Sequence, residues 1–211
     1  MSSVTPTDDE TAAPGRRMSS DERREQILLA ALAVFGARGY EGTTTDEVAR
    51  AAGVSQPYVV RLFGTKENLF LAVLQLAFDR LMATFRAELA RTDGDEPTAK
   101  RIGNAYIALL SVRGLHQTLS HAFLLGAHPV IGPEARACFS RVWEFLRTEA
   151  GYSGEEAQLF LAQGMLINTL IGLRLITDYD ADRNIKELFE ACFPTELKSV
   201  MRLVPRAGDP W

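Results

Sequence analysis

Cysteine is scarce in this sequence: the 211 residues include only Cys138 and Cys192. Two thiols cannot build a disulfide framework, and neither stands in a spacing typical of metal ligands. We therefore expect reduced thiols in a cytoplasmic protein and predict no metal and no other cofactor.

The sequence also predicts neither a secretion signal nor a membrane span. The first residues, "MSSVTPTDDETAAPG", are polar and acidic where a signal peptide would be basic and then apolar. The most apolar stretch, Ala157 to Leu173, is short for a membrane helix and contains Gln158, Gln163 and Asn168. It is predicted to be a buried helix, and no membrane partner is expected.

The three histidines do not form a recognisable catalytic site. His116 and His121 are five residues apart, so they do not share a helix face, and His128 adjoins Pro129 in a predicted loop. No carboxylate stands at a ligand spacing from them, and the sequence has no phosphate-binding glycine loop or nucleophile elbow. We predict no enzyme activity, with a helical enzyme whose front motif is purely structural kept as an alternative.

Helical periodicity dominates the chain, and no alternating strand pattern is visible. An all-α fold is therefore predicted, with a disordered arm at 1–18, a front domain at 19–80, a larger helical bundle at 81–204 and a loose tail at 205–211. The expected helices are 20–39, 44–52, 55–63, 65–90, 98–111, 115–127, 133–150, 155–177 and 184–193, with a further turn or two at 195–203.

Two short helices at 43–63 are joined by a very tight turn. Thr44-x-x-Glu47 is a capping box for the first helix, and Gly53 suits the left-handed conformation that ends it. Ser55 is expected to cap the second helix, and Pro57 falls in its first turn, where a missing N–H costs little. This arrangement is a helix-turn-helix, whose second helix can enter the major groove of DNA.

The overall charge permits such a role without requiring it. A net charge of -4 excludes a uniformly basic protein surface, but the front part of the chain is mildly basic. Val59 and Phe63, four residues apart, give the second helix a narrow apolar stripe for docking. Its other residues are then left facing outward.

Residues 20–78 resemble the TetR family of transcriptional regulators. The resemblance lies in "REQILLAALAVFGARGY", "TTTDEVARAAGVS" and "RLFGTKENLF". It implies that Thr45 and Lys66 contact DNA phosphates and that the second helix faces the groove. The predicted DNA interface comprises Thr44, Thr45, Ser55, Gln56, Pro57, Tyr58, Val60, Arg61 and Lys66.

The recognition helix departs from the common family pattern. Val60 stands where many members have tyrosine, the aromatic residue is Tyr58, and Arg61 replaces a neutral ring. Arg61 is therefore a candidate for reading guanine, with a phosphate contact as the alternative.

The resemblance further implies a ligand-binding and dimerisation domain behind the front domain. A mostly apolar pocket is predicted, lined by Phe85, Tyr106, Leu110, His121, Phe123, Trp143, Met165 and Asn168. A filled core is the alternative for each of these residues. The helix at 155–177 is apolar nearly all round, which predicts a two-fold interface through Leu159, Gly164, Ile167, Leu170 and Ile171.

The sequence as a whole predicts a homodimeric repressor that binds a pseudo-palindromic double-stranded operator. A small apolar or amphipathic effector would release it by favouring a second conformation. A dimeric regulator without any small-molecule effector is the main alternative.

Overall fold

A computed structural model describes residues 18–92 and 95–206, so nearly all of the predicted arm and most of the predicted tail lie outside it. Within these residues the chain forms helices and turns and no strand, which confirms the all-α prediction. The helices are α1 (Ser20–Arg38), α2 (Thr45–Ala52), α3 (Gln56–Phe63), α4 (Lys66–Ala90), α5 (Thr98–Ala108), α6 (Leu115–Leu124), α7 (Ile131–Glu144), α8 (Gly154–Gly172), α9 (Arg183–Cys192) and α10 (Leu197–Leu203).

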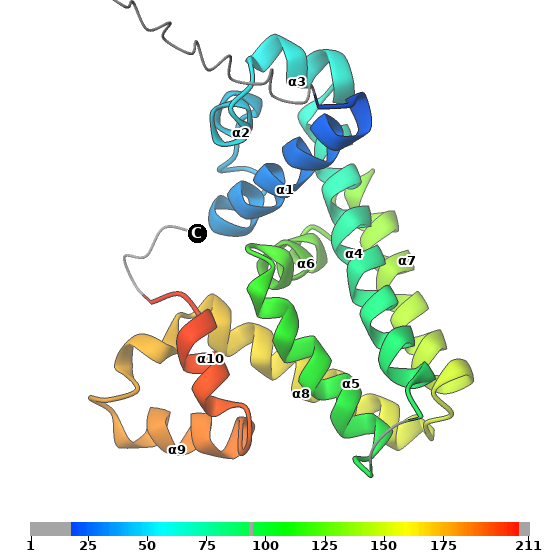
Figure 1. The fold of residues 1–211 in the computed structure, drawn as a ribbon, viewed down its shortest axis with the longest axis vertical. Coiled ribbons are helices and arrows are strands. Elements are labelled where there is room, and N and C mark those ends of the chain that lie inside the picture. The colour runs from blue at the N-terminus through cyan, green and yellow to red at the C-terminus, as the bar shows by residue number, and fades with distance from the viewer. Residues whose placement is uncertain (1–17, 93–94, 207–211) are drawn as a thin grey trace, which may run out of the picture.

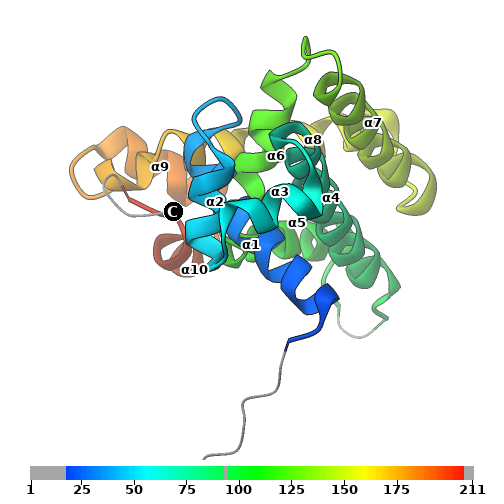
Figure 2. The same cartoon turned by 90° about the horizontal axis from the view of Figure 1, so that it is seen from above.

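The helices form two groups that share one long element. Helices α1, α2 and α3 lie at one end of the molecule, and α4 runs from them along the length of the bundle formed by the later helices (Figure 1). Seen from above, α7 and α9 lie on opposite sides of the molecule (Figure 2). The front domain is therefore attached to the bundle through α4.

Helix α4 contributes to the cores of both groups. Near its start Phe70 meets Phe35 of α1 edge-on, with ring centroids 5.0 Å apart. Near its end Phe85 packs against Phe145, with centroids 5.8 Å apart. The helix is long and apolar enough to cross a membrane by composition alone, but half of its most apolar window is buried inside the protein. Burial of this kind is expected for a core helix that serves two domains.

A second connection joins the front domain to the bundle between α1 and α6. The Thr118 hydroxyl of α6 donates a hydrogen bond to the Leu32 carbonyl of α1 at 3.3 Å. Thr118 is completely buried, and Leu32 is too. A movement of α6 must therefore be accommodated by α1.

Several helix ends differ from the predicted ones. Helix α8 ends at Gly172 instead of Thr177, because Arg174 adopts a left-handed backbone with φ 52°. Helix α6 ends at Leu124, before the predicted Ala127. Helix α7 begins at Ile131 and passes into a π-helical turn, Phe145–Glu149, where Glu149 accepts two hydrogen bonds from the Arg86 guanidinium at 2.7 and 2.8 Å.

Candidate nucleic-acid interface

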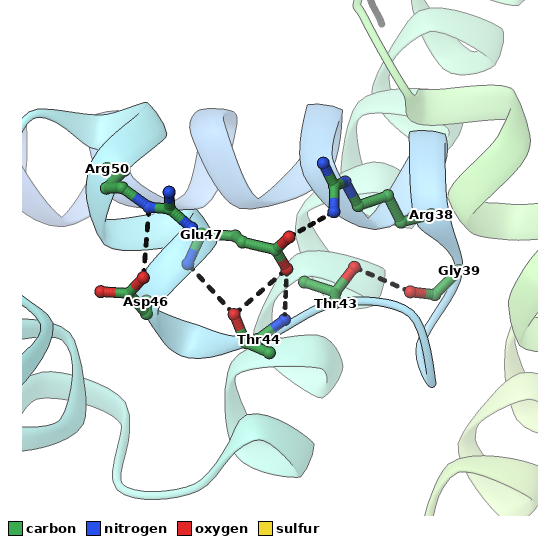
Figure 3. A network of polar contacts seen from close by, with 7 residues as sticks. All are labelled: Arg38, Gly39, Thr43, Thr44, Asp46, Glu47 and Arg50. Carbon is green, nitrogen blue, oxygen red and sulfur yellow. Dashed lines mark hydrogen bonds and ion pairs between the residues drawn. The ribbon is translucent and has the colours of Figure 1, made fainter.

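A polar network fixes the start of α2 (Figure 3). The Thr44 hydroxyl accepts from the Glu47 backbone N–H at 3.2 Å and donates to the Glu47 carboxylate at 3.1 Å. The same carboxylate accepts the Thr44 N–H and pairs with Arg38. These hydrogen bonds from Thr44, together with the charges of Arg38 and Arg50, lower the pKa of the Glu47 carboxyl. Thr44 is therefore primarily a helix cap, as the capping box predicted.

The turn between α2 and α3 has the predicted glycine geometry. Gly53 is left-handed, with φ 65° and ψ 33°, and ends α2. Ser55 occupies the N-cap position of α3, but its hydroxyl makes no capping hydrogen bond, so the expected cap is wrong. Pro57 lies in the first turn as predicted, and Ser55 is left exposed at the tip.

Helix α3 docks through one narrow face and leaves the other open. Val59 and Phe63 are buried, which confirms the predicted docking stripe. Pro57, Val60 and Arg61 are exposed. The exposed residues thus form the outer face of a helix that the rest of the domain supports.

Side-chain contacts organise the residues around this outer face. The Gln56 amide donates to the Thr45 hydroxyl at 3.2 Å, which links the first residues of α3 and α2. The Arg61 guanidinium lies 4.8 Å from the centroid of the half-buried Tyr58 ring. A cation over an aromatic face is attracted to it, so the Tyr58 ring supports the Arg61 guanidinium in this position.

Lys66, the first residue of α4, is held by a residue that the sequence analysis did not select. Its ammonium donates to the Tyr40 carbonyl at 3.0 Å and lies 4.4 Å from the Tyr40 ring centroid. An ammonium has three N–H donors, so two remain for another acceptor. In the sequence, Tyr40 follows Gly39, where α1 ends, and it is the last residue of the segment "REQILLAALAVFGARGY" that carries the family resemblance.

A cavity of about 540 Å³ lies in the helical bundle. Five of the eight predicted pocket residues line it, on α4, α5, α6 and α8. They are Phe85, Tyr106, Phe123, Met165 and Asn168. Further apolar lining residues that were not predicted include Leu81, Ile107, Phe139, Val142 and Phe160.

Three predicted pocket residues lie elsewhere, which corrects the sequence interpretation. Leu110 faces a separate, smaller cavity near α10. His121 points toward α1, where its ring lies 3.5 Å from the position a Cβ on Gly39 would take. Trp143 is on the outer face of α7, with 39% of its surface exposed. Composition marked these residues as suitable, but the helix face each occupies depends on the neighbouring helices.

The residues predicted for the dimer interface are divided by the fold. Ile167, Leu170 and Ile171 are at most 4% exposed and are buried within the single chain. Gly164 and Leu159 both border the cavity, and Leu159 is also 58% exposed. The outer face of α8 instead carries Leu159, Leu166 and Leu173, so the all-round apolar helix has one face against its own bundle and one face open.

Comparison with known proteins gives the same picture of the front domain. Residues 27–73 match the family model described as bacterial regulatory proteins of the tetR family. The HTH-type transcriptional activator FasR of Mycolicibacterium smegmatis is 29% identical over 160 residues, covering 72% of this chain and 71% of that protein. The HTH-type transcriptional repressor NicS of Pseudomonas putida is 27% identical over 116 residues, covering 49% of this chain and 54% of NicS.

The fold of the whole chain has counterparts as well. A TetR-like transcriptional regulator from Rhodococcus sp. RHA1 matches with a TM-score of 0.58 and 18% identity, covering 89% of this chain and 94% of the other. At this identity the likeness concerns the fold alone. Residues 27–73, which span α1 to the first part of α4, thus form a DNA-binding domain of the TetR family, and the sequence similarity to known regulators supports a DNA-binding transcriptional regulator.

Proposed function

We propose that this regulator is a cytoplasmic homodimeric repressor that binds a pseudo-palindromic operator and is released by a small apolar or amphipathic effector. The observation that carries the proposal is the combination of an outward-facing α3 with a cavity in the bundle behind it. No catalytic role is assigned. The name of NicS supports repression, whereas FasR is named an activator, so the direction of regulation is part of what must be tested.

The DNA contacts are proposed by position and chemistry. Gln56, Pro57, Tyr58 and Val60 would face base edges in the major groove, with Ser55 at the tip of the helix. Thr45 would donate its hydroxyl to a phosphate, because that oxygen already accepts from Gln56. Lys66 would use its two remaining donors on the backbone. Thr44 would act indirectly, through the α2 cap.

The DNA-binding part is tested by footprinting the purified protein on the intergenic DNA beside its own coding sequence. A protected site with two related half-sites, centred about one helical turn or roughly 34 Å apart, is expected for a two-fold dimer. Transcription from that fragment should fall when the protein is added. A rise would identify an activator, and a single protected half-site would contradict the dimer.

The residues that line the cavity limit the chemical class of the proposed effector. Most of its lining is apolar, and its volume lies in the range that holds drug-sized ligands. Inside it the Tyr106 hydroxyl donates to the Asn168 side-chain oxygen at 2.6 Å, and Asn168 is only 9% exposed. The hydroxyl of Tyr106 uses the oxygen of the Asn168 amide, and the amide nitrogen is a donor that can face a ligand. An apolar ligand with one uncharged acceptor, such as a carbonyl, would accept from it.

A fluorescence assay tests two questions separately: whether the cavity binds a ligand at all, and whether it prefers a ligand with a carbonyl group. N-phenylnaphthylamine should become fluorescent on entering the cavity, and an aliphatic ketone should displace it better than a hydrocarbon of equal length. One hydrogen bond corresponds to roughly a three- to tenfold preference. Asn168→Leu should abolish that preference, while Tyr106→Phe should retain it. Failure of the fluorophore to bind would favour the alternative of a regulator without an effector.

The proposed release mechanism uses the two connections between the domains. Ligand in the cavity would touch α4 and α6, and these helices carry the front domain through Phe70 and Thr118. A ligand shifts the equilibrium between two conformations only by its difference in affinity for them. The expected result is that the ketone probe raises the melting temperature and weakens DNA binding in the same concentration range.

A further inference from the structure

His128 lies in the turn between α6 and α7 and has a defined set of contacts. Its Nδ1 accepts backbone N–H groups of Val130 at 3.3 Å and Ile131 at 3.2 Å. Because Nδ1 is an acceptor, the neutral ring carries its hydrogen on Nε2. That nitrogen lies 3.7 Å from a carboxylate oxygen of Glu67 in α4. The histidine therefore caps the start of α7 with one nitrogen and faces the front of α4 with the other.

The same ring also supports Tyr40. His128 meets the Tyr40 ring edge-on, with centroids 5.5 Å apart and an interplanar angle of 81°. On its other sides Tyr40 packs against Phe35 and Phe70, with centroids 6.4 and 5.3 Å away. A residue of the bundle thus completes the packing around an aromatic side chain of the front domain.

Tyr40 in turn fixes the ammonium of Lys66, as described above. Lys66 begins α4, and the N-terminal end of a helix dipole is unfavourable for a positive charge. The Tyr40 carbonyl and ring, with the Glu67 carboxylate next in the chain, offset this repulsion. The position of the ammonium therefore depends on the Tyr40 backbone and ring staying where they are.

We propose that His128 is a positioning residue for the DNA-backbone contact, acting from the effector-binding bundle through Tyr40 and Glu67 on Lys66. The inference rests on the phosphate contact proposed for Lys66. Helix α7, which His128 caps, also lines the cavity through Phe139 and Val142 and packs against α4. A ligand that displaces α7 would change the support of Lys66 through this route, separately from the α1–α6 connection.

The test is a double-mutant cycle on the full chain. His128→Asn keeps an oxygen that can accept the N–H groups at the start of α7, but it removes the ring and the Nε2–H. Binding is measured on a short random-sequence duplex over a range of salt concentrations, so the operator need not be known. His128→Asn should weaken binding roughly three- to tenfold and reduce the salt dependence. In a Lys66→Ala background the same substitution should have no further effect.

A second variant and a control distinguish positioning from a general loss of structure. Tyr40→Leu leaves the α6–α7 turn intact but removes the ring between His128 and Lys66, and it should repeat the His128→Asn loss, while Tyr40→Phe keeps the ring and carbonyl and should bind normally. If His128→Asn weakened binding equally in the wild-type and Lys66→Ala backgrounds, the positioning role of His128 would be rejected, and the phosphate contact of Lys66 would stand. If Lys66→Ala itself left affinity and salt dependence unchanged, the proposed phosphate contact would be rejected first.

Discussion

Gly36 of α1 and Gly114, just before α6, approach so closely that a Cβ on Gly36 would lie 2.5 Å from the Gly114 Cα. Gly114 also adopts φ 81°, and a Cβ there would overlap the Leu32 carbonyl. The backbone of the DNA-binding domain and that of the bundle are thus in direct contact, with no side chain between them. Neither partner in this contact can be enlarged without moving a helix.

This contact predicts that Gly36→Ala destabilises the protein. The added methyl group meets backbone atoms, which cannot rotate away, so a loss of about 1–3 kcal/mol in the free energy of unfolding is expected. Gly103→Ala in α5 is the matched control, because nothing lies within 4 Å of its added Cβ. The control should be neutral or stabilised by about 0.5–1 kcal/mol. Urea unfolding of both variants measures the difference; equal stabilities would mean that the helices separate easily here.

Arg61 and Tyr58 are predicted to act as one unit in sequence recognition. If Arg61 reads guanine, Arg61→Ala should cost about 1–3 kcal/mol on the natural operator and relax the preference at one base pair per half-site. Tyr58→Ala should weaken the same preference, because it removes the ring beneath the guanidinium, while Tyr58→Phe should retain it. Affinities on single-base operator variants provide the measurement. A loss that is uniform over all sequences would instead assign Arg61 to a phosphate.

Lys66→Ala is expected to behave differently from Arg61→Ala. A phosphate contact carries no sequence information, so binding should weaken alike on every duplex. The slope of log affinity against log salt should become shallower by about one. Titrations at two salt concentrations are sufficient, and a sequence-dependent loss would contradict the assignment.

The exposed face of α8 predicts where dimer-disrupting substitutions belong. Leu166→Glu and Leu173→Glu place a charge on residues that are 40% and 65% exposed in the protomer, so folding should be retained while the dimer dissociates. Leu170→Glu is the contrasting variant, since Leu170 is 2% exposed and a buried unpaired charge should unfold the protein. Sedimentation and circular dichroism would separate these outcomes. A folded dimer for both surface variants would place the interface on another face.

Stability should fall in mild acid because of His116. Burial lowers the pKa of His116 to about 4, although its Nε2 lies 3.1 Å from the Tyr106 carbonyl. The unfolded chain, with an ordinary histidine pKa, binds the proton first as the pH falls, which favours unfolding. Between pH 7.5 and 5 this should remove on the order of 2 kcal/mol of stability. His116→Gln retains a donor for the carbonyl and should lose this part of the pH dependence in urea titrations.

Local signals predicted the helix-turn-helix well, because its geometry depends on neighbouring residues. The Thr44–Glu47 capping box and the left-handed Gly53 are each determined within a few residues of chain. The contact between Lys66 and Tyr40 spans 26 residues, and no pattern in either segment indicates it. Trp143 and His121 were misplaced for a related reason: periodicity identifies a helix, but which face is covered depends on where distant helices pack.

The π-helical turn at Phe145–Glu149 changes the direction in which the side chains that follow it point. Such a turn holds one more residue than an α-helical turn, so everything after it is rotated by about 100° relative to an uninterrupted helix. The added rotation is part of the path that brings Glu149 onto Arg86 and the Tyr152 ring to within 6.0 Å of Phe160. Deleting one residue here would keep the side chains that line the cavity, but it would rotate α8 relative to α7 and so change the directions in which they point. The shape of the cavity therefore depends on the number of residues in this turn, and relatives that differ in that number would enclose different volumes with similar residues.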